Sequence, residues 1–530
     1  MKRLILIMVV MMLMTSTALA AGKKILYVPI DDRPCNLYQV VQVAEKLGYE
    51  LLTPPAELLG RNTHSGEPDK LWAWLNENAP QASFAVISTD AMLYGSLIDS
   101  RLHDLSAEII LERAKRFKTF DEKFSYMPIY AFGTIMRTPR SASASIAEPE
   151  YYKTYGAKIF QYTAFLDEQE MNELTARDSR ELKRLAKDIP KEYLDDWFTR
   201  RAINSDANEL FIDYTRQGVF EYFLLGCDDS AKYSQTHRES RHLSELSKDL
   251  GKTVIQVTSG ADELGMLMIA RAINKDRDEI PFVSVIYNNG KGAATFPSYA
   301  NETIGIAIDA AIIAAGCLRI PDHERADLVL AVNTRRNGKT FEASDFKKNH
   351  GKPRNDLKPL MTTIKELTAK NYPVGVVDIA FANGADKSLM NQLKNDDLQY
   401  KIRAYGGWNT ATNSSGFLIG ASVLTKHMDE RSIAELLTTR YLDDWAYQAN
   451  IRPELYSKIW AKGGNVWAID SDTLPQLEQF LTERLNAFAA ENIIIPRRWK
   501  LENIKASLPW QRAFECDPRF NINGDDLKDR

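Results

Sequence analysis

The stretch of sequence that decides the fold is ILYVPIDDRPCN, residues 25–36. It begins with a continuous apolar run, and the run ends abruptly in two aspartates, an arginine and a proline. An apolar run without alternating polar residues is typical of a parallel strand that is buried on both faces. The polar residues therefore stand where this strand ends.

The same pattern recurs along the chain. Other apolar runs also end in polar or glycine-rich residues and precede a helical pattern. These runs are Phe84–Ser88, Met127–Phe132, Tyr222–Leu225, Thr253–Val257, Phe282–Tyr287, Leu328–Val332, Val374–Ile379 and Ile402–Tyr405, with Glu50–Thr53 as a weaker example. Strands that alternate with helices predict an α/β fold of parallel strands joined by right-handed crossover helices.

The number of runs exceeds the eight strands of a single closed barrel. We expect a barrel-like first part over residues 21–290, with a charged helical insertion at 138–219. A smaller α/β part is expected over 291–428, and a helical C-terminal region over 429–530. The pentapeptide YLDDW occurs twice, at 193–197 and 441–445. Its flanks do not match, which favours two similar amphipathic helices over a duplicated domain.

Composition and charge narrow the function classes. The chain has 530 residues, of which 44% are hydrophobic and 26% charged, which excludes a mostly disordered protein. The formal net charge is -4 and no dense basic cluster occurs, so we expect no nucleic-acid partner. The four cysteines are too scattered for a disulfide framework. Cys35 and Cys227 both follow predicted strands and could lie close together.

The N-terminus carries the pattern of a secretory signal peptide. Lys2 and Arg3 precede an apolar run, and Ala18-Leu19-Ala20 has the small-residue spacing of a cleavage site. We expect cleavage after Ala20 and an exported protein, periplasmic or secreted. No later stretch approaches 18 apolar residues, so we expect no stable membrane insertion after cleavage.

The candidate catalytic residues are two pairs of adjacent acids, each placed after a predicted strand. The pairs are Asp228-Asp229 and Asp262-Glu263. Crowding raises the pKa of one carboxyl in such a pair, which can then act as a general acid while its neighbour stays ionised. Neighbouring strands would bring the two pairs close together.

Other strand ends carry residues suited to binding a polar ligand. Arginine can form a two-pronged contact, asparagine both donates and accepts, and tryptophan offers a flat apolar face. The candidate substrate-binding residues are Asp31, Asp32, Arg33, Asn36, Asp90, Arg137, Trp408, Asn409 and Asn413. An alternative stays open for Arg33 and Arg137, which could instead form internal braces with aspartates.

Familiar cofactor and nucleophile motifs are missing from the sequence. It contains no Gly-x-Ser-x-Gly elbow, Walker loop, Gly-x-Gly-x-x-Gly fingerprint or His-Glu-x-x-His. We therefore expect no cofactor and no resident metal. A site rich in Asp, Glu, Asn, Arg and Trp in an exported protein predicts a glycoside hydrolase that acts on a small-molecule or oligosaccharide substrate.

Two alternative functions remain open. The first is a metal-assisted hydrolase of an envelope component, in which Asp31, Asp90 and Asp228 would converge on a magnesium or calcium ion. The second is a periplasmic solute-binding protein with two α/β lobes, a hinge and no reactive carboxyl pair.

Several motifs together resemble a known family. They are PIDDRPCN at 29–36, DDS at 228–230, GADE at 260–263, GWNT at 407–410 with Asn413, and DWAYQ at 444–448. They resemble the bacterial domain-of-unknown-function family 4127 over nearly the whole mature chain. That resemblance implies a single architecture and no particular activity. The Asp228-Asp229 pair is also similar to the adjacent acids of retaining hexosaminidases that use the acetamide of the substrate as nucleophile.

Overall fold

The computed structural model describes residues 22–62, 64–140 and 147–524 of the chain. The predicted signal peptide, residues 1–20, lies outside the described residues. Parallel sheets flanked by helices make up the described part, and the predicted α/β fold class is confirmed. None of the helices in these ranges is both long and apolar enough to cross a membrane.

The first sheet contains six parallel strands in the spatial order β2-β1-β3-β4-β5-β6. Its four central strands are almost wholly buried, which explains their continuous apolar sequences. The strands are β1 Lys24–Val28, β2 Glu50–Leu52, β3 Phe84–Ser88, β4 Ile129–Ile135, β5 Tyr222–Cys227 and β6 Ile255–Ser259.

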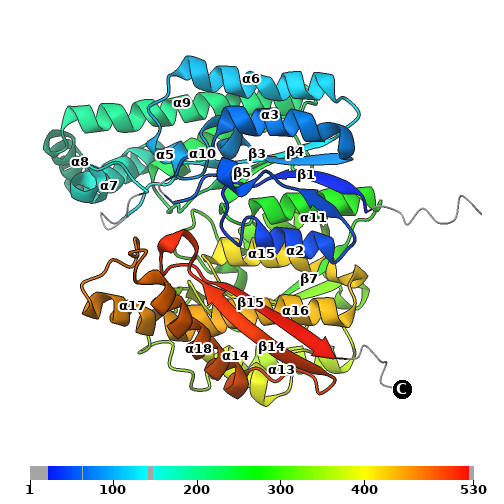
Figure 1. Cartoon of the computed structure of the whole chain (residues 1–530). Coiled ribbons are helices and arrows are strands. Elements are labelled where there is room, and N and C mark those ends of the chain that lie inside the picture. The colour runs from blue at the N-terminus through cyan, green and yellow to red at the C-terminus, as the bar shows by residue number, and fades with distance from the viewer. Residues whose placement is uncertain (1–21, 63, 141–146, 525–530) are drawn as a thin grey trace, which may run out of the picture.

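Helices cover both faces of this sheet and, with it, form the first lobe (Figure 1). The outer face packs on α3 Pro68–Asn78, α6 Ala107–Lys123, α9 Lys191–Arg216 and α10 Gln235–Leu246. The inner face packs on α2 Tyr38–Glu45 and α11 Leu264–Asp276. The remaining helices of this lobe are α4 Thr89–Leu93, α5 Asp99–Leu102, α7 Tyr152–Met171 and α8 Ala176–Asp188. Helices α7, α8 and α9 fill the chain between β4 and β5.

The second lobe is built on five parallel strands in the order β13-β11-β9-β7-β8. When the strands of each sheet are renumbered along the chain from the first strand of that sheet, both sheets contain the spatial order 2-1-3-4-5. The strands are β7 Phe282–Tyr287, β8 Leu318–Arg319, β9 Leu328–Asn333, β11 Val374–Asp378 and β13 Ala404–Gly406; a separate short pair is β10 Phe341–Glu342 with β12 Phe381–Ala382. The helices are α12 Ile304–Ala314, α13 Lys358–Ala369, α14 Lys387–Asn395 and α15 Ala411–Ser422.

The structure corrects the expected barrel-like first part. A closed barrel needs its first and last strands to pair, whereas the first sheet is open, with β2 and β6 at its edges. Strand β7 was expected in the first part because it lies before residue 290. It instead pairs with β8 and β9 in the second sheet. The lobe boundary therefore falls between α11 and β7.

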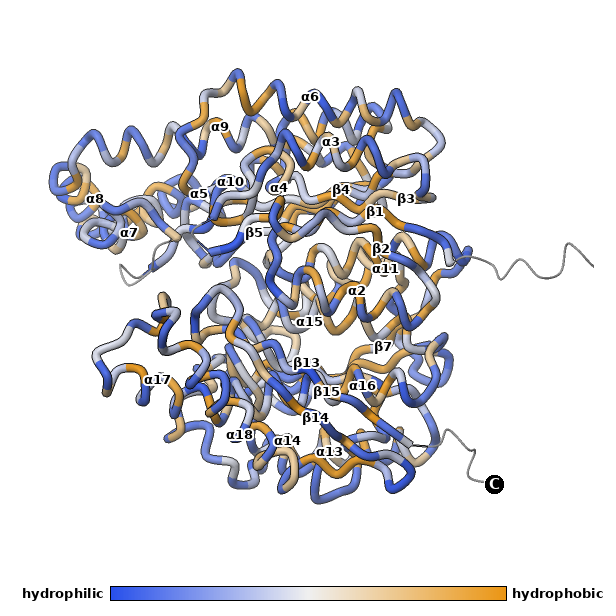
Figure 2. Tube along the Cα trace, viewed as in Figure 1, coloured by the Kyte–Doolittle hydropathy of each residue, from blue (hydrophilic) through white to orange (hydrophobic). Residues whose placement is uncertain are grey.

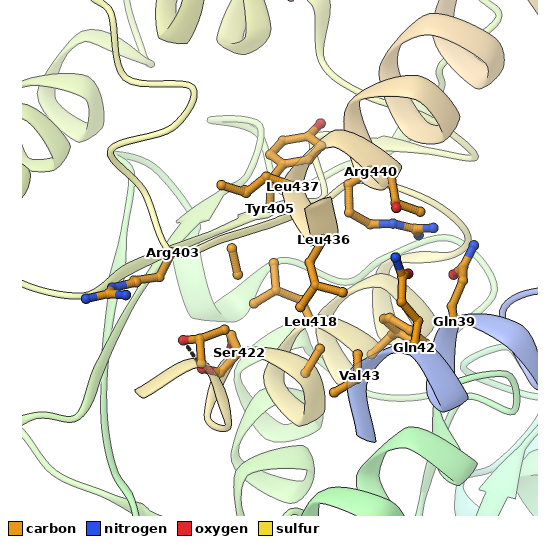
Figure 3. Close-up of a pocket in the computed structure, with 15 residues that line it drawn as sticks. Gln39, Gln42, Val43, Arg403, Tyr405, Leu418, Ser422, Leu436, Leu437 and Arg440 are labelled. Atoms are coloured by element: carbon orange, nitrogen blue, oxygen red, sulfur yellow. Dashed lines mark hydrogen bonds between the residues drawn. The ribbon is translucent and has the colours of Figure 1, made fainter. Parts of the chain in front are cut away.

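The two lobes share one hydrophobic core. The largest buried cluster runs from Tyr27 of β1, through α11 and α15, to the strands of the second sheet. Figure 2 shows apolar residues concentrated along both sheets and the helices between them. Helices α11 and α15 pack closely, since a Cβ atom at Gly420 would lie 3.0 Å from Met266 Cγ. A small cavity of about 40 Å³ remains between α2 and the C-terminal region, and its lining includes Gln39 and Val43 of α2 and Leu437 (Figure 3).

The C-terminal region wraps around the second lobe and is mainly helical, as predicted. It contains α16 Glu430–Arg440, the π-helix η6 Tyr441–Ile451, α17 Arg452–Ala461 and α18 Leu474–Asn492. Beyond the predicted helices, β14 Trp499–Ser507 and β15 Asp517–Gly524 form an antiparallel hairpin. The chain between these two strands reaches back to the first lobe at Asp32.

Candidate functional site

The polar residues after β1 and β6 form one buried ion-pair network. Arg33 Nη2 lies 2.7 Å from Asp31 Oδ2 and 2.6 Å from Asp262 Oδ1. Its Nη1 donates to the second oxygen of Asp262 at 3.2 Å. Asn36 Nδ2 donates to Asp31 Oδ1 at 2.8 Å. Arg33 therefore braces two carboxylates, which is the alternative that the sequence left open.

The second lobe completes this network. Asn409, on the loop after β13, donates from Nδ2 to Asp262 Oδ2 at 2.9 Å. Asn413 at the start of α15 accepts from the backbone N–H of Ala261 at 3.1 Å. Residues from strand ends of both sheets thus meet at the lobe junction, as expected for ligand sites in parallel α/β folds.

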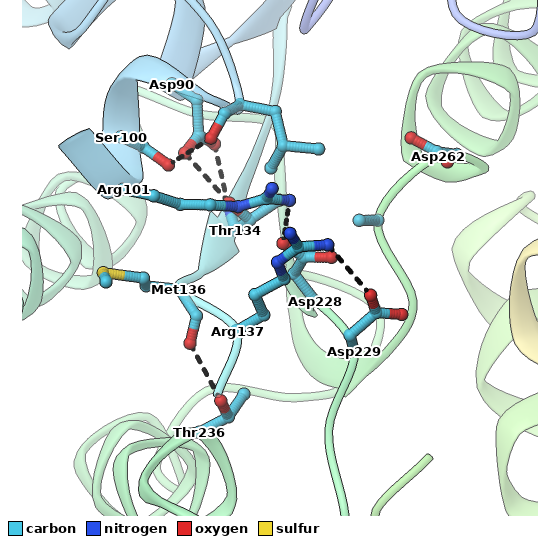
Figure 4. A network of polar contacts seen from close by, with 12 residues as sticks. Asp90, Ser100, Arg101, Thr134, Met136, Arg137, Asp228, Asp229, Thr236 and Asp262 are labelled. Atoms are coloured by element: carbon cyan, nitrogen blue, oxygen red, sulfur yellow. Dashed lines mark hydrogen bonds and ion pairs between the residues drawn. The ribbon is translucent and has the colours of Figure 1, made fainter. Parts of the chain in front are cut away.

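Asp228 and Asp229 lie on the neighbouring loop after β5, each with its own arginine (Figure 4). Arg101 forms a buried ion pair with Asp228. Arg137 Nη1 lies 3.2 Å from Asp229 Oδ2, and its Nε lies 2.6 Å from Glu148 Oε1. The side chain of Asp228 is 8% exposed and that of Asp229 is 32% exposed. Asp229 is therefore the carboxylate of this pair that a ligand can reach.

The environment of these acids separates their proton affinities. Burial raises the pKa of Asp229 to about 6, the charge of Asp228 adds to the rise, and Arg137 opposes it. Burial would also raise the pKa of Asp262, but the charge and hydrogen bonds of Arg33 outweigh it and hold the pKa below its usual value. Near neutral pH the site thus offers one carboxyl that exchanges a proton beside one that stays ionised.

We call Asp31, Asp228, Asp229 and Asp262, with the arginines that pair with them, the carboxylate cluster. Two predicted residues, Asp90 and Glu263, do not face it. The carboxylate of Asp90 is buried and accepts from the backbone N–H and the hydroxyl of Thr134, at 2.8 and 2.9 Å. Burial raises its pKa to about 7. The side chain of Glu263 turns back over Gly260 and packs against Gly416 of α15. It is 2% exposed, and burial raises its pKa to about 8. Both carboxyl groups are thus buried in this arrangement.

Trp408 and Asp32 also have internal partners. The ring of Trp408 is 5% exposed and lies 6.1 Å from the ring of Phe514, so it offers no open face for a sugar. Asp32 accepts from Trp510 Nε1 at 2.5 Å and lies 3.4 Å from Arg61 Nε. Asp32 thus anchors the C-terminal segment at the edge of the site.

Several residues of the site were not predicted from the sequence as site residues, although Asp444 lies in the YLDDW and DWAYQ motifs. Arg101 lies on the four-residue helix α5, outside any strand-end motif. Asp444 belongs to the second YLDDW pentapeptide and sits on the π-helix, where it accepts from the backbone N–H of Gly407 at 2.7 Å. It thereby holds the loop that carries Asn409. Glu148 and Glu515 were also missed; Glu515 lies 3.9 Å from Arg33.

The electrostatic balance defines what the site can bind. Six carboxylates surround four arginines, and every arginine is already paired with at least one carboxylate; the acids are Asp31, Asp228, Asp229, Asp262, Glu148 and Glu515, and the arginines Arg33, Arg101, Arg137 and Arg512. Every arginine of this set thus has a neighbouring carboxylate, although the Nε atom of Arg101 is buried without a partner among the described residues. Neutral, hydroxyl-rich or cationic ligands are therefore favoured over anions.

Metal ligation and disulfide chemistry find little support in the geometry. Within the described ranges, no group of three or more His, Cys, Asp or Glu side chains is placed to hold an ion. Asp31, Asp90 and Asp228 engage Arg33, Thr134 and Arg101 respectively, rather than one common point. Cys35 and Cys227 are free, buried thiols.

Comparison with known proteins gives one match. A family model described as "Protein of unknown function (DUF4127)" matches residues 25–518. No curated protein and no solved structure matches the chain. The matched range includes the strand-end residues of both lobes and the segment around Trp510.

Proposed function

The chain belongs to the DUF4127 family, and we propose that it is an exported carbohydrate-active hydrolase, specifically a glycoside hydrolase. Its reaction centre is the carboxylate cluster at the lobe junction. Asp229 is the general acid, and Asp228 and Asp262 are the charged carboxylates that surround the sugar. Export rests on the signal-peptide pattern of residues 1–20, and a mature chain that begins at Ala21 is expected.

The observation that carries this proposal is the contrast between Asp229 and its neighbours. Asp229 is the most exposed member of the pair and its pKa is raised to about 6, so its proton can be transferred near neutral pH. Asp228 and Asp262 are each held by an arginine. Glycoside hydrolysis requires a carboxylic acid that protonates the leaving oxygen beside a second carboxylate.

The charge balance suits the same reaction. The transition state of glycoside hydrolysis carries positive charge on the sugar ring. Because carboxylates outnumber arginines at the site, the surplus negative charge lowers the energy of that state relative to a neutral bound sugar. The amide of Asn409 supplies both a donor and an acceptor at the cluster.

The two other functions fit the geometry less well. A solute-binding protein closes about a hinge, whereas these lobes share one continuous core through α11 and α15. A metal-assisted hydrolase would need Asp31, Asp90 and Asp228 to face one ion, and these side chains engage three separate partners. A rigid site built on acid–base chemistry is therefore the better match.

A screen for hydrolysis tests the proposal. The purified mature protein is incubated with a panel of nitrophenyl glycosides and with solubilised cell-wall fragments, alongside Asp228→Asn and Asp229→Asn. Asp249→Asn is the matched control, because Asp249 pairs with Arg216 on the exposed surface. We expect release from at least one glycoside, lost in the two site variants and kept in the control. Absence of release from the whole panel, or full activity in both site variants, contradicts the proposal.

A further inference from the structure

A polar cavity lies at the opposite end of the second sheet from the carboxylate cluster. It has a volume of about 680 Å³, within the range of small-molecule sites. It is lined at the strand entries by Tyr372, two residues before β11, and by Arg403, directly before β13. The carboxyl ends of the same strands lead to the cluster at the lobe junction. The two sites are thus separated by the length of the sheet.

One of the four cationic side chains in this cavity has no partner. Lys365 lies 2.7 Å from Asp396, Lys401 lies 2.7 Å from Asp397, and Arg498 pairs with Glu430. Among the described residues, the guanidinium of Arg403 has no hydrogen bond or ion pair. Figure 3 shows it extended away from the small cavity beside α2. Arg403 therefore offers an unoccupied fork of N–H donors, the geometry that matches a carboxylate.

Two residues of the cavity lining also have buried polar atoms that lack partners. The indole N–H of Trp499 and the Oδ2 atom of Asp396 are buried without a hydrogen bond in the described part of the chain. Trp499 is only 4% exposed. Buried polar groups are nearly always satisfied by protein, water or ligand. The indole N–H is a donor and the carboxylate oxygen an acceptor, and hydroxyl groups, which both accept and donate, match such a pair.

Aromatic side chains complete the lining. Tyr372 and Tyr400 are both half-buried at the cavity. The Tyr400 hydroxyl is bound to Thr438 at 2.8 Å, which leaves the ring as its contribution to the cavity wall. Aromatic faces together with a few polar groups are typical of sites for ring-shaped polar ligands.

We propose that this cavity binds an acidic sugar, with its carboxylate on the guanidinium of Arg403 and its hydroxyls near Trp499 and Asp396. The anionic preference is opposite to that of the carboxylate cluster, where every arginine is already paired. The proposal does not depend on hydrolysis, since it concerns binding at the other end of the sheet. It would let the protein hold an acidic polysaccharide or cell-wall strand apart from the reaction centre.

Calorimetric titration with glucuronic acid and with N-acetylmuramic acid tests this inference, with glucose as the neutral probe. We expect saturable binding of at least one acidic sugar and at least tenfold weaker binding in Arg403→Gln. Arg403→Lys keeps the charge without the fork and should fall between the two. Arg484→Gln is the control, because Arg484 forms an exposed pair with Glu454. Thermal melting verifies that each variant is folded.

Three results overturn the inference. They are absence of binding by both acidic sugars, equal affinity in Arg403→Gln and wild type, and binding that is lost in Asp229→Asn but kept in Arg403→Gln. The last result assigns the ligand to the carboxylate cluster instead. Failure of the glycoside screen leaves the calorimetric outcome unaffected, so the two proposals fail separately.

Discussion

Replacement of Arg33 by methionine removes the cation that braces two buried carboxylates. The side chain of Arg33 is 7% exposed, and those of Asp31 and Asp262 are 0% and 9% exposed. Breaking a buried pair by removing one partner costs about 3–5 kcal/mol. Asn36 and Asn409 still donate to these carboxylates, so we expect the lower end, about 3 kcal/mol. At about 1 °C per kcal/mol for a chain of this length, Tm falls by about 3 °C at neutral pH.

The pH dependence of this loss identifies its cause. In the wild type the pKa of Asp262 is lowered, so its pairing stabilises the fold above the unfolded-state pKa and is lost as pH falls through the folded value. In Arg33→Met the main group that opposes burial is gone, so the pKa of Asp262 rises and mild acid neutralises the buried charge.

Melting is measured at pH 7.5 and pH 5 for wild type, Arg33→Met and the control Arg484→Met, whose ion pair is 47% exposed on both sides. The gap in Tm between wild type and Arg33→Met should shrink at pH 5. A gap that stays constant or widens refutes the electrostatic account of the brace.

Three further outcomes are expected. Asn409→Ala removes the 2.9 Å hydrogen bond to Asp262, and a bond to a charged group contributes about 1.5–3 kcal/mol, so Tm should fall while the overall fold is kept; an unchanged Tm contradicts this. Glu263→Gln should gain stability relative to wild type as pH rises from about 4.5 to 8, because the raised pKa of Glu263 makes wild-type stability decline over that window; a pH-independent difference in Tm argues against it. Asp444→Ala leaves the backbone N–H of Gly407 without its acceptor, so turnover should fall about tenfold or more. Asp444→Asn keeps an acceptor oxygen and should recover most of the turnover. Equal rates in the two variants count against a positioning role for Asp444.

Local pattern was enough to locate most strands. The apolar run at 84–88 coincides with β3, and the run at 328–332 covers all but the last residue of β9, because burial on both faces leaves a continuous apolar sequence. The same argument could not tell an open sheet from a barrel, since both bury such strands equally. The change of sheet between β6 and β7 depends on pairing between distant segments, and nothing local marks it.

The candidate site was predictable in position and less so in detail. Parallel strands end at one edge, and this brought Asp31, Arg33 and Asp262 together as expected. Side-chain direction after a strand depends on backbone angles that sequence does not reveal, so Glu263 turns over Gly260 while adjacent Asp262 faces Arg33. Arg101 was missed because a short helix, outside the motif pattern, carries it to Asp228.

The pH dependence of kcat/KM tests the central claim most directly. It is measured for wild type, Asp229→Asn and the control Asp249→Asn on a glycoside that the protein hydrolyses. If Asp229 is the general acid, wild-type activity falls above about pH 6 as its proton is lost, in line with its raised pKa. The Asn variant should lose about 10²–10⁴-fold in rate and show no alkaline limb near that pH, while the control keeps both. An Asp229→Asn enzyme with the rate and alkaline limb of the wild type would contradict the assignment.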